Sequence, residues 1–151
     1  MAYVAVQEAD FDPGAEIARL TGHAGGAGGI GCFIGVVRGE GGDRAITAMT
    51  LEHYPGMTER ALRVIAEEAE RRWNPCRVRV VHRVGRLTPG ERIVLVLVAA
   101  PHRKPALAAT SFLIDWLKTK APFWKKEHFA DGSTAWVEAR AEDAEAAARW
   151  G

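Results

Sequence analysis

The spacing of apolar residues along the chain follows two periods, and each period predicts a different kind of element. In some short segments apolar and polar residues alternate, or apolar residues run unbroken, and both patterns are typical of β-strands. We expect strands at residues 3–7, 30–38, 45–54, 77–84, 93–100 and 134–139.

The longest helical pattern occupies residues 105–120. Apolar side chains recur there every three or four residues, which places them on one face of a helix. Pro105 suits the first position of a helix, and Pro122 forbids its continuation. The apolar stripe consists of Leu107, Thr110, Ile114 and Leu117.

Three other segments predict helices. A second long amphipathic helix follows Pro55 and Thr58 and ends before Asn74 and Pro75. A short helix begins at Pro13, where the carboxylate of Asp12 can cap it, and an alanine-rich helix spans residues 142–150. The apolar side of the long helix consists of Ala61, Leu62, Ile65, Ala69 and Trp73.

These elements predict an α+β fold with a mostly antiparallel sheet and the two long helices packed on it. The strands at 77–84 and 93–100 are joined through the turn Leu-Thr-Pro-Gly and should pair in antiparallel fashion. Strand 30–38 is apolar on both sides, so we expect Cys32 in the core. His82 shares the buried side of its strand, where a hydrogen-bonded core histidine is a commoner outcome than a catalytic one.

Composition limits the function classes. The 151 residues predict one domain, 1–151, and carry 20 Lys and Arg against 19 Asp and Glu, a formal charge of +1. Proteins that bind nucleic acid through its phosphates normally carry an excess of positive charge, so we expect any cationic site to be local. No segment approaches the roughly 18 apolar residues of a membrane helix, and the N-terminus lacks a signal peptide pattern, so a cytoplasmic protein is expected.

Cysteines and glycines predict no cofactor. Cys32 and Cys76 lie far apart, without the spacing of a zinc site or of a disulfide scaffold, so no metal is expected. The glycine-rich segment 22–31 contains G-x-G-x-x-G at Gly26, Gly28 and Gly31. That motif binds dinucleotides when it follows a strand and opens a helix, whereas this one leads into a strand, so we do not expect a Rossmann site.

Cationic residues gather near the end of helix 105–120 and predict an anion site. Lys118 continues the edge of the apolar stripe, whereas Lys120, about 200° further round the helix, points away. After Pro122 we expect Phe123 and Trp124 to be buried as a plug. This plug would hold Lys125, Lys126 and Glu127 near the helix end.

Two other segments can add to this site. The turn 101–104 contains His102 and Arg103 between a strand end and a helix N-terminus, a position suited to anions. Arg38 ends its strand beside the glycine-rich segment 39–43, which reads as a flexible loop. The alternative interpretation is a solvated basic helix terminus that merely complements the helix dipole.

Several blocks of the sequence, taken together, resemble the catalytic large subunit of molybdopterin synthase. The similarity runs from about residue 28 to the C-terminus and implies an α/β-hammerhead-like fold. The blocks that carry it, in chain order, are FIGVVR, LEHYPGMTERAL, VHRVGRLTPGE, APHRKPAL, IDWLKTKAPFWKKE and DGSTAWVEAR.

The resemblance implies a reaction and partners. The family is a sulfurtransferase of molybdenum cofactor biosynthesis that converts cyclic pyranopterin monophosphate (precursor Z) into molybdopterin by inserting two dithiolene sulfurs. A small ubiquitin-like subunit supplies the sulfur as a thiocarboxylate on its C-terminal Gly-Gly tail. Two large subunits form a dimer with one small subunit at each end, a heterotetramer. The implied substrate and tail site comprises Val36, Val37, Arg38, His102, Arg103, Lys118, Lys125, Lys126 and Glu127.

Chemistry assigns expected roles within that set. The substrate phosphate and the thiocarboxylate are both anionic, so clustered cations are needed to bring them together. We expect Arg38 and Arg103 to bind phosphate and Lys118, with Lys125 as its partner, to act in acid/base or covalent catalysis. A lysine among other cations should have a lowered pKa.

Two other function classes fit parts of the sequence. One is a single-strand RNA or nucleotide binder with Phe123 and Trp124 as stacking platforms. The other is a non-catalytic module that only accepts the tail of a ubiquitin-like protein. A sulfur carrier of the rhodanese kind would need an exposed cysteine of low pKa, and neither cysteine fits, so we expect the sulfur to come from a partner.

Overall fold

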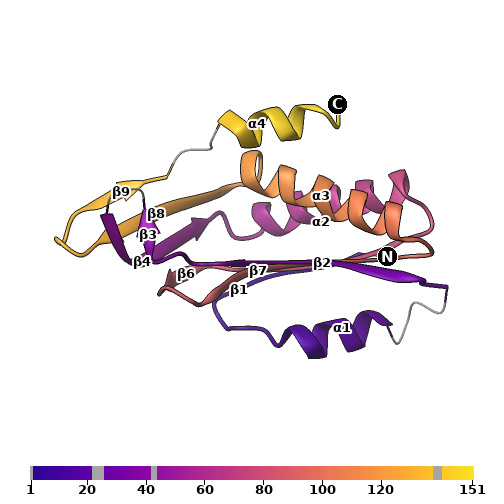
Figure 1. Ribbon diagram of the computed structural model, residues 1–151, viewed down its shortest axis with the longest axis horizontal. Coiled ribbons are helices and arrows are strands. Elements are labelled where there is room, and N and C mark those ends of the chain that lie inside the picture. Colours follow the sequence, from indigo (N-terminus) through magenta and orange to yellow (C-terminus); the bar gives the residue numbers. More distant parts are fainter. Residues whose placement is uncertain (1, 22–25, 42–43, 138–140) are drawn as a thin grey trace.

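The computed structural model describes residues 2–21, 26–41, 44–137 and 141–151. Its four helices and nine strands within these ranges follow one another along the chain as shown in Figure 1. In order they are β1 (Tyr3–Gln7), α1 (Pro13–Thr21), β2 (Gly29–Val36), β3 (Glu40–Gly41), β4 (Arg44–His53), α2 (Met57–Arg72), β5 (Arg77–Arg83), β6 (Gly85–Leu87), β7 (Arg92–Ala100), α3 (Arg103–Thr119), β8 (Phe123–Phe129), β9 (Thr134–Trp136) and α4 (Ala141–Ala148).

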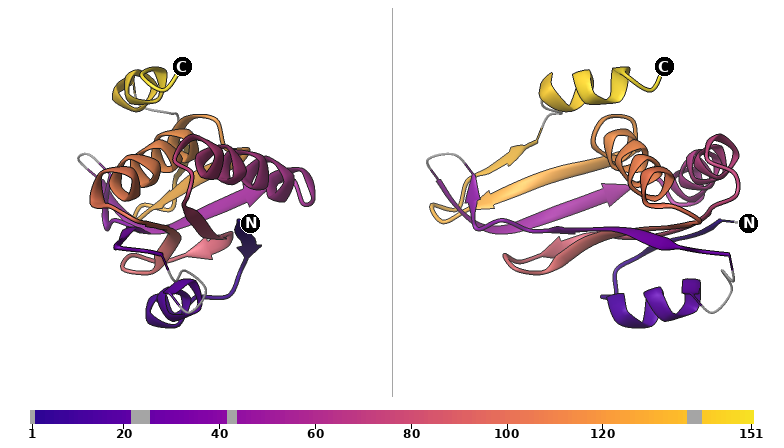
Figure 2. Two further views of the ribbon diagram at one scale, coloured as in Figure 1. Left: turned by 90° about the vertical axis from the view of Figure 1, so that its right-hand side faces the viewer. Right: turned by 45° about the vertical axis from the view of Figure 1, so that its right-hand side comes forward.

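The first sheet has the strand order β1-β5-β7-β2 and forms the middle layer of the molecule. Only β1 and β5 pair in parallel, so the predicted antiparallel pairing of β5 with β7 is confirmed. Helices α2 and α3 cover one face of this sheet and α1 covers the other, as Figures 1 and 2 show. The inner strand β7 is therefore buried on both faces, which explains its unbroken apolar run.

The helix predictions are confirmed within a few residues at each end. The Asp12 carboxylate accepts a hydrogen bond from the amide of Ala15 and so caps α1, as expected. Helix α3 begins two residues before Pro105. The alanine-rich C-terminal helix is present as α4, which lies against α3.

The predicted core position of Cys32 was wrong, and one residue of the predicted apolar stripe of α3 is exposed. Cys32 is exposed because β2 is the edge strand of the sheet and α1 packs on the inner strands β5 and β7. Leu107 is 61% exposed, because the buried side of α3 is centred on Ala106, Ala109, Thr110 and Leu113.

Gly31 explains why α3 presents small residues to the sheet. A Cβ atom on Gly31 would lie 2.3 Å from Thr110 Oγ1 and 2.6 Å from the carbonyl oxygen of Ala106, so β2 and α3 approach too closely for a side chain. A Cβ on Gly28 would lie 2.1 Å from the carbonyl oxygen of Pro101. Gly28 and Gly31 of the motif therefore serve packing, whereas a Cβ on Gly26 would meet nothing within 4 Å, and the motif leads into β2 as expected.

The second sheet was not predicted as such. Its strand order is β3-β4-β8-β9, with β6 also paired to β4, and it continues beyond the first sheet at one end of the molecule in Figure 1. Residues 123–129 form β8, antiparallel to β4, instead of a buried plug. Pro122 excludes a helix there, and β4 offers unpaired backbone groups that the segment satisfies. Trp124 is 41% exposed, so the prediction that it is buried was wrong.

Some predictions fall partly outside the described residues. Residues 22–25 of the glycine-rich segment, residues 42–43 of the expected loop and residues 138–139 of the last strand are among them. Within the described part of that loop, Glu40 and Gly41 form the short strand β3. None of the described helices has the length and apolar character needed to cross a membrane.

Candidate active site

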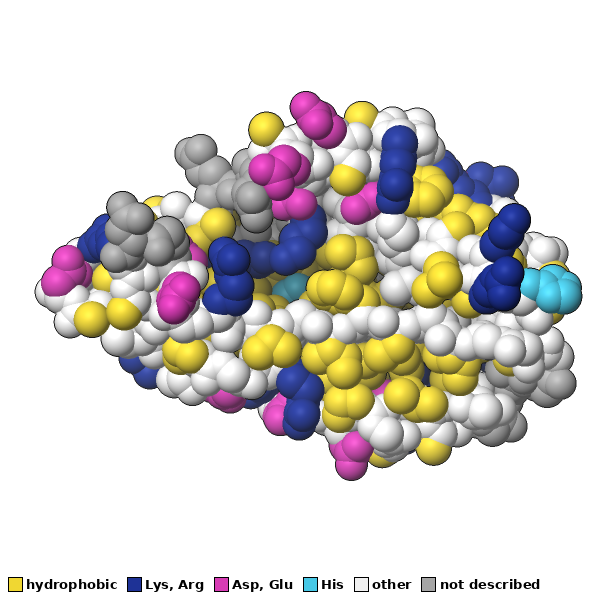
Figure 3. Space-filling model, in the orientation of Figure 1, with side chains coloured by type: hydrophobic (Ala, Val, Ile, Leu, Met, Phe, Trp, Pro, Cys, Tyr) yellow, Lys and Arg dark blue, Asp and Glu magenta, His cyan; other side chains and the backbone are white. Residues whose placement is uncertain are grey.

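A pocket of about 560 Å³ lies where the two sheets and the C-terminal end of α3 meet. In Figure 3, Lys and Arg side chains gather around a hollow in this part of the molecular surface. Residues from β2, β4, β7, α3, β8 and α4 line the pocket, so segments from most of the chain contribute to it. Its charged lining residues are Arg38, Lys118, Lys125, Glu127 and Asp143.

Local structure explains which lysines reach the pocket. Lys118 lies in the last turn of α3 and lines the pocket, whereas Lys120 lines a separate hollow beside Arg72 and Trp150. The predicted divergence of Lys118 and Lys120 is confirmed. Side chains alternate along β8, so Lys125 shares its face of the strand with Phe123 and Glu127.

Lys125 has an altered proton affinity. The pKa of Lys125 is lowered to about 8, mainly by burial and also by the nearby charge of Lys118, and Asp143 partly opposes both effects. The pKa of Lys125 is thus lowered as expected of a lysine near other cations, but burial, which was not the expected cause, contributes more than the charge of Lys118. At a pKa near 8 this amine can both give and accept a proton close to neutral pH.

Apolar side chains form much of the remaining lining, among them Phe33, Leu117 and Phe123. The Phe123 ring stacks on His82, with ring centroids 3.8 Å apart. His82 is buried, its Nδ1 lies 2.8 Å from the carbonyl oxygen of Arg83, and burial lowers its pKa to about 3. His82 is therefore the neutral, hydrogen-bonded core residue that we expected, and it supports Phe123 from behind.

The structure brings some of the expected site residues together but not others. Arg38, Lys118, Lys125, Glu127 and Val36 all line the pocket. Val37 does not, because its side chain is buried and its amide and carbonyl are bonded to the turn at residues 90–91.

Lys126 lies on the opposite face of β8, with its ammonium 5.4 Å from the centre of the Trp136 ring. His102 and Arg103 are exposed at the N-terminal end of α3 and do not line the pocket. Arg103 and Lys118 are separated by roughly 22 Å along the helix axis, at about 1.5 Å of rise per residue. Within one chain these residues cannot share a site with Lys118.

The chain also supplies one charged residue that the sequence did not single out. Asp143 belongs to α4, and its position depends on the docking of that helix. Trp150 packs against Trp73 and Phe112, and its indole nitrogen donates a hydrogen bond of 2.6 Å to Asp115. No periodicity or motif places a C-terminal helix over a particular pocket, so no sequence signal could have found Asp143.

The thiols are poor nucleophiles. Burial raises the pKa of Cys76 to about 11, and partial desolvation of the Cys32 thiol also raises its pKa although the residue is exposed. Neither forms a thiolate readily at neutral pH. Among the described residues, no group of three or more His, Cys, Asp and Glu side chains is arranged to hold a metal ion.

Comparison with known proteins gives consistent matches. The family model described as MoaE protein matches residues 6–120. The molybdopterin synthase catalytic subunit of Ralstonia nicotianae is 51% identical over 151 residues, which cover 100% of this chain and 85% of that protein.

Solved structures agree with these matches. A molybdopterin biosynthesis MoaE protein from Burkholderia ambifaria superposes with a TM-score of 0.86 at 51% identity, covering 100% of this chain and 99% of that one. A chain from Helicobacter pylori, in a protein–protein complex of subunits 1 and 2 of molybdopterin-converting factor, shares the fold with a TM-score of 0.71 at 19% identity; 92% of this chain and 91% of that chain are covered.

Proposed function

The chain belongs to the MoaE protein family, and from that membership we propose that it converts cyclic pyranopterin monophosphate into molybdopterin. In this proposal two dithiolene sulfurs are inserted into the substrate. They arrive as a thiocarboxylate on the C-terminal Gly-Gly tail of a small ubiquitin-like subunit. The chain is thus the catalytic subunit of an enzyme of molybdenum cofactor biosynthesis, and the sulfur transfer is the step assigned to its pocket.

The pocket lined by Arg38, Lys118 and Lys125 is the observation that carries the proposal. A cyclic phosphate and a thiocarboxylate repel each other, and three cations lower the free energy of holding both in one cavity. The aromatic and aliphatic side chains of the lining suit a flat pterin ring and an extended peptide tail.

Lys118 and Lys125 are the proposed catalytic residues, either as acid and base or through a covalent adduct. The pKa of about 8 supports proton transfer by Lys125, and the charge of Lys118 contributes to that value. Lys118 lies on a packed helix, so its backbone is fixed relative to the substrate. Glu127 lines the same pocket and is proposed to orient the lysines, and Val36 to contact substrate at the rim.

Arg38 is the proposed phosphate ligand, because a guanidinium can bind phosphate through two parallel hydrogen bonds. His102 and Arg103 lie at the N-terminal end of α3, and the pocket of the same chain lies at the other end. They can therefore join Arg38 only from a second copy of the chain. We therefore propose that a dimer of large subunits completes each site. Val37 and Lys126 contact other parts of the protein, so any effect they have on substrate is indirect.

The donor of sulfur is proposed to be external to this chain. Both thiols have raised pKa values, which disfavours a persulfide carrier within the chain. The small subunit would bind at the pocket of each large subunit, giving a heterotetramer with one donor for each site.

The direct test combines the purified chain, cyclic pyranopterin monophosphate and a thiocarboxylated small subunit, with the dithiolene product detected by mass spectrometry. Lys118→Ala should lower the rate at least about 100-fold, because a positioned acid/base group contributes at least that factor. The variant should keep its fold and its affinity for the small subunit. Lys120→Ala is the matched control and should retain wild-type turnover, since Lys120 faces a different hollow. Normal turnover by Lys118→Ala would contradict the assignment.

The RNA-binding alternative is weakened by the aromatic residues. One face of the Phe123 ring is stacked on His82 and the ring lies inside the pocket, so it does not form an open stacking platform; the Trp124 ring packs edge-to-face with Tyr54, with ring centroids 4.7 Å apart. The non-catalytic module would bind the tail of the small subunit as the proposed enzyme does, but would not transfer sulfur. The mixture of chain, cyclic pyranopterin monophosphate and thiocarboxylated small subunit therefore distinguishes the two. Binding of the small subunit without dithiolene product would favour the module.

A further inference from the structure

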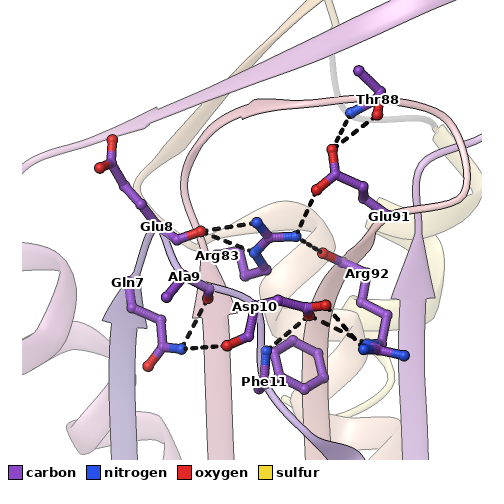
Figure 4. A network of polar contacts seen from close by, with 9 residues as sticks. All are labelled: Gln7, Glu8, Ala9, Asp10, Phe11, Arg83, Thr88, Glu91 and Arg92. Carbon is purple, nitrogen blue, oxygen red and sulfur yellow. Dashed lines mark hydrogen bonds and ion pairs between the residues drawn. The ribbon is translucent and has the colours of Figure 1, made fainter.

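One segment of the chain carries a dense polar network but lines no part of the pocket. It includes Arg83 at the end of β5 and the turn from Thr88 to Glu91 that leads into β7. Figure 4 shows this network, which also reaches the segment after β1. Because no residue from 81 to 91 touches the pocket, the catalytic proposal gives this network no role.

Arg83 is the centre of the network. Its guanidinium is buried and donates to the backbone carbonyl oxygens of Glu8, at 2.9 and 3.0 Å, and of Arg92, at 3.1 Å. A fourth hydrogen bond, from Nη1, goes to the Glu91 carboxylate at 3.2 Å. A buried guanidinium with this many fixed acceptors has little freedom to move.

Glu91 transmits that rigidity to the turn. Its second carboxylate oxygen accepts hydrogen bonds from the amide of Thr88 at 2.6 Å and from the Thr88 hydroxyl at 2.9 Å. These hydrogen bonds, together with Arg83, lower the pKa of Glu91, so the carboxylate stays ionised at neutral pH. One side chain therefore ties the turn to a buried arginine.

The turn is hydrogen-bonded to Val37, the residue before Arg38. The amide of Val37 donates to the carbonyl oxygen of Glu91 at 2.9 Å, and the amide of Gly90 donates to the carbonyl oxygen of Val37 at 2.9 Å. On the other side, the carbonyl oxygen of Gly39 accepts a hydrogen bond of 3.0 Å from the amide of Ile46. Arg38 itself is exposed and lies between two residues with fixed backbones, Val37 and Gly39. Because the turn holds Val37, the backbone position of Arg38 depends on the turn.

We propose that Glu91, anchored by Arg83, is a positioning residue that holds Arg38 in place to receive the phosphate of the substrate. Glu91 touches no substrate in this proposal, and it acts through Thr88, Val37 and the backbone of Arg38. The proposal rests on the assignment of Arg38 to phosphate binding. A displacement of about 1 Å at a bidentate ligand is enough to weaken binding severely, so a remote anchor can control it.

The test is a double-mutant cycle between Glu91 and Arg38. Glu91→Ala should raise KM for cyclic pyranopterin monophosphate about tenfold and change kcat less than about threefold, because Arg38 binds substrate and does not transfer protons. In the Arg38→Ala background the same change should alter KM less than about twofold. Equal effects in both backgrounds would show that Glu91 acts on general stability and would overturn the proposal.

Asp10→Asn is the matched control. Asp10 belongs to the same network and pairs with Arg92 at 2.9 Å, but it does not contact the turn. This variant should leave KM unchanged. A rise in KM equal to that of Glu91→Ala would show that loss of any part of the network weakens substrate binding. That result would contradict a specific role of Glu91 in positioning Arg38.

Amide relaxation and hydrogen exchange measured by NMR separate this proposal from the proposed function. Glu91→Ala should speed exchange at the amides of Val37 and Gly90 and lower the backbone order of Arg38, whereas Asp10→Asn should do neither. Glu91→Gln should give the same result if the alanine variant does not fold. If the wild-type protein makes no dithiolene product but the NMR changes are present, only the proposed function is contradicted. If the backbone order of Arg38 is unchanged in Glu91→Ala, the proposed positioning role of Glu91 is contradicted.

Discussion

Lys118, Lys120 and Lys125 carry the same ammonium group but have different surroundings. Lys118 and Lys125 share the pocket, and Lys120 lies at another hollow. Burial is the main reason that the pKa of Lys125 falls to about 8. The proposed catalytic role of Lys125 and its effect on stability therefore have one physical origin, the removal of an amine from water.

Lys125→Met should stabilise the protein at neutral pH. Below pH 8 the lysine is charged in both states, and the folded state bears the full penalty of the lowered pKa. Between about pH 8 and 10.5 the folded state loses its proton before the unfolded state does, so wild-type stability rises with pH. Denaturant unfolding should show Lys125→Met more stable than wild type by about 1 to 3 kcal/mol at pH 7, with the difference closing towards pH 10.5.

Lys120→Met serves as the comparison for that measurement, because Lys120 lies outside the pocket and should show no such dependence on pH. A loss of stability in Lys125→Met at pH 7 would contradict the burial penalty. Lys125→Met should also lose activity, which makes Lys125 a residue retained at the expense of stability.

At the scale of elements, the site depends on how β2, α3 and β8 meet. Helix α3 can lie close to β2 because Gly31 has no side chain, and this fixes the axis that carries Lys118. Strand β8 then leaves the end of α3 and pairs with β4, which turns Lys125 and Glu127 towards the same pocket. Neither placement follows from the sequence of one element alone.

Gly31→Ala should therefore be strongly destabilising. The new Cβ would lie 2.3 Å from Thr110 Oγ1 and 2.6 Å from the carbonyl oxygen of Ala106, and α3 must shift to admit it. We expect a loss of about 2 to 3 kcal/mol in the free energy of unfolding, as for overpacked cores.

Gly29→Ala is a matched control in the same strand, because its Cβ would meet nothing within 4 Å. Denaturant titration of both variants, with wild type, decides the point. Equal stability of the two variants would show that the approach of β2 and α3 is not the limiting contact.

At the scale of the whole molecule, the proposed dimer brings His102 and Arg103 to the pocket of a second copy of the chain, because the length of α3 separates them from the pocket of their own chain. The proposed dimer predicts complementation between two inactive variants. Lys118→Ala and Arg103→Ala are each expected to be nearly inactive alone. In random heterodimers one of the two sites combines the intact Lys118 of one chain with the intact Arg103 of the other, so a mixture should recover about a quarter of wild-type activity.

Turnover after the two variants are unfolded and refolded together, with each variant refolded alone as the control, measures this recovery. Sedimentation at several concentrations should show a dimer in the same samples. No recovery in a dimeric mixture would mean that Arg103 acts elsewhere, and a monomeric active protein would contradict the shared site.

The extent of successful prediction differs between elements for physical reasons. Periodicity was enough to predict the helices α2 and α3 and the strands β5 and β7. Each is long enough to show its pattern, and each contributes apolar side chains to the core around the first sheet. Strand β8 was missed because its residues are mixed aromatic and charged, and its pairing with β4 is a non-local contact. Cys32 was placed in the core because an edge strand and an inner strand can have the same apolar sequence.

The candidate site divides in the same way. The sequence by itself determined the helix that carries Lys118, the divergence of Lys120, and the presence of cations near both ends of α3, since these depend on local geometry and composition. Only the tertiary structure decided that Arg38, Lys118 and Lys125 share a cavity, that Arg103 does not join them within one chain, and that Asp143 does. The reason is that burial and proximity, which set the pKa of Lys125, arise from contacts between segments distant in sequence.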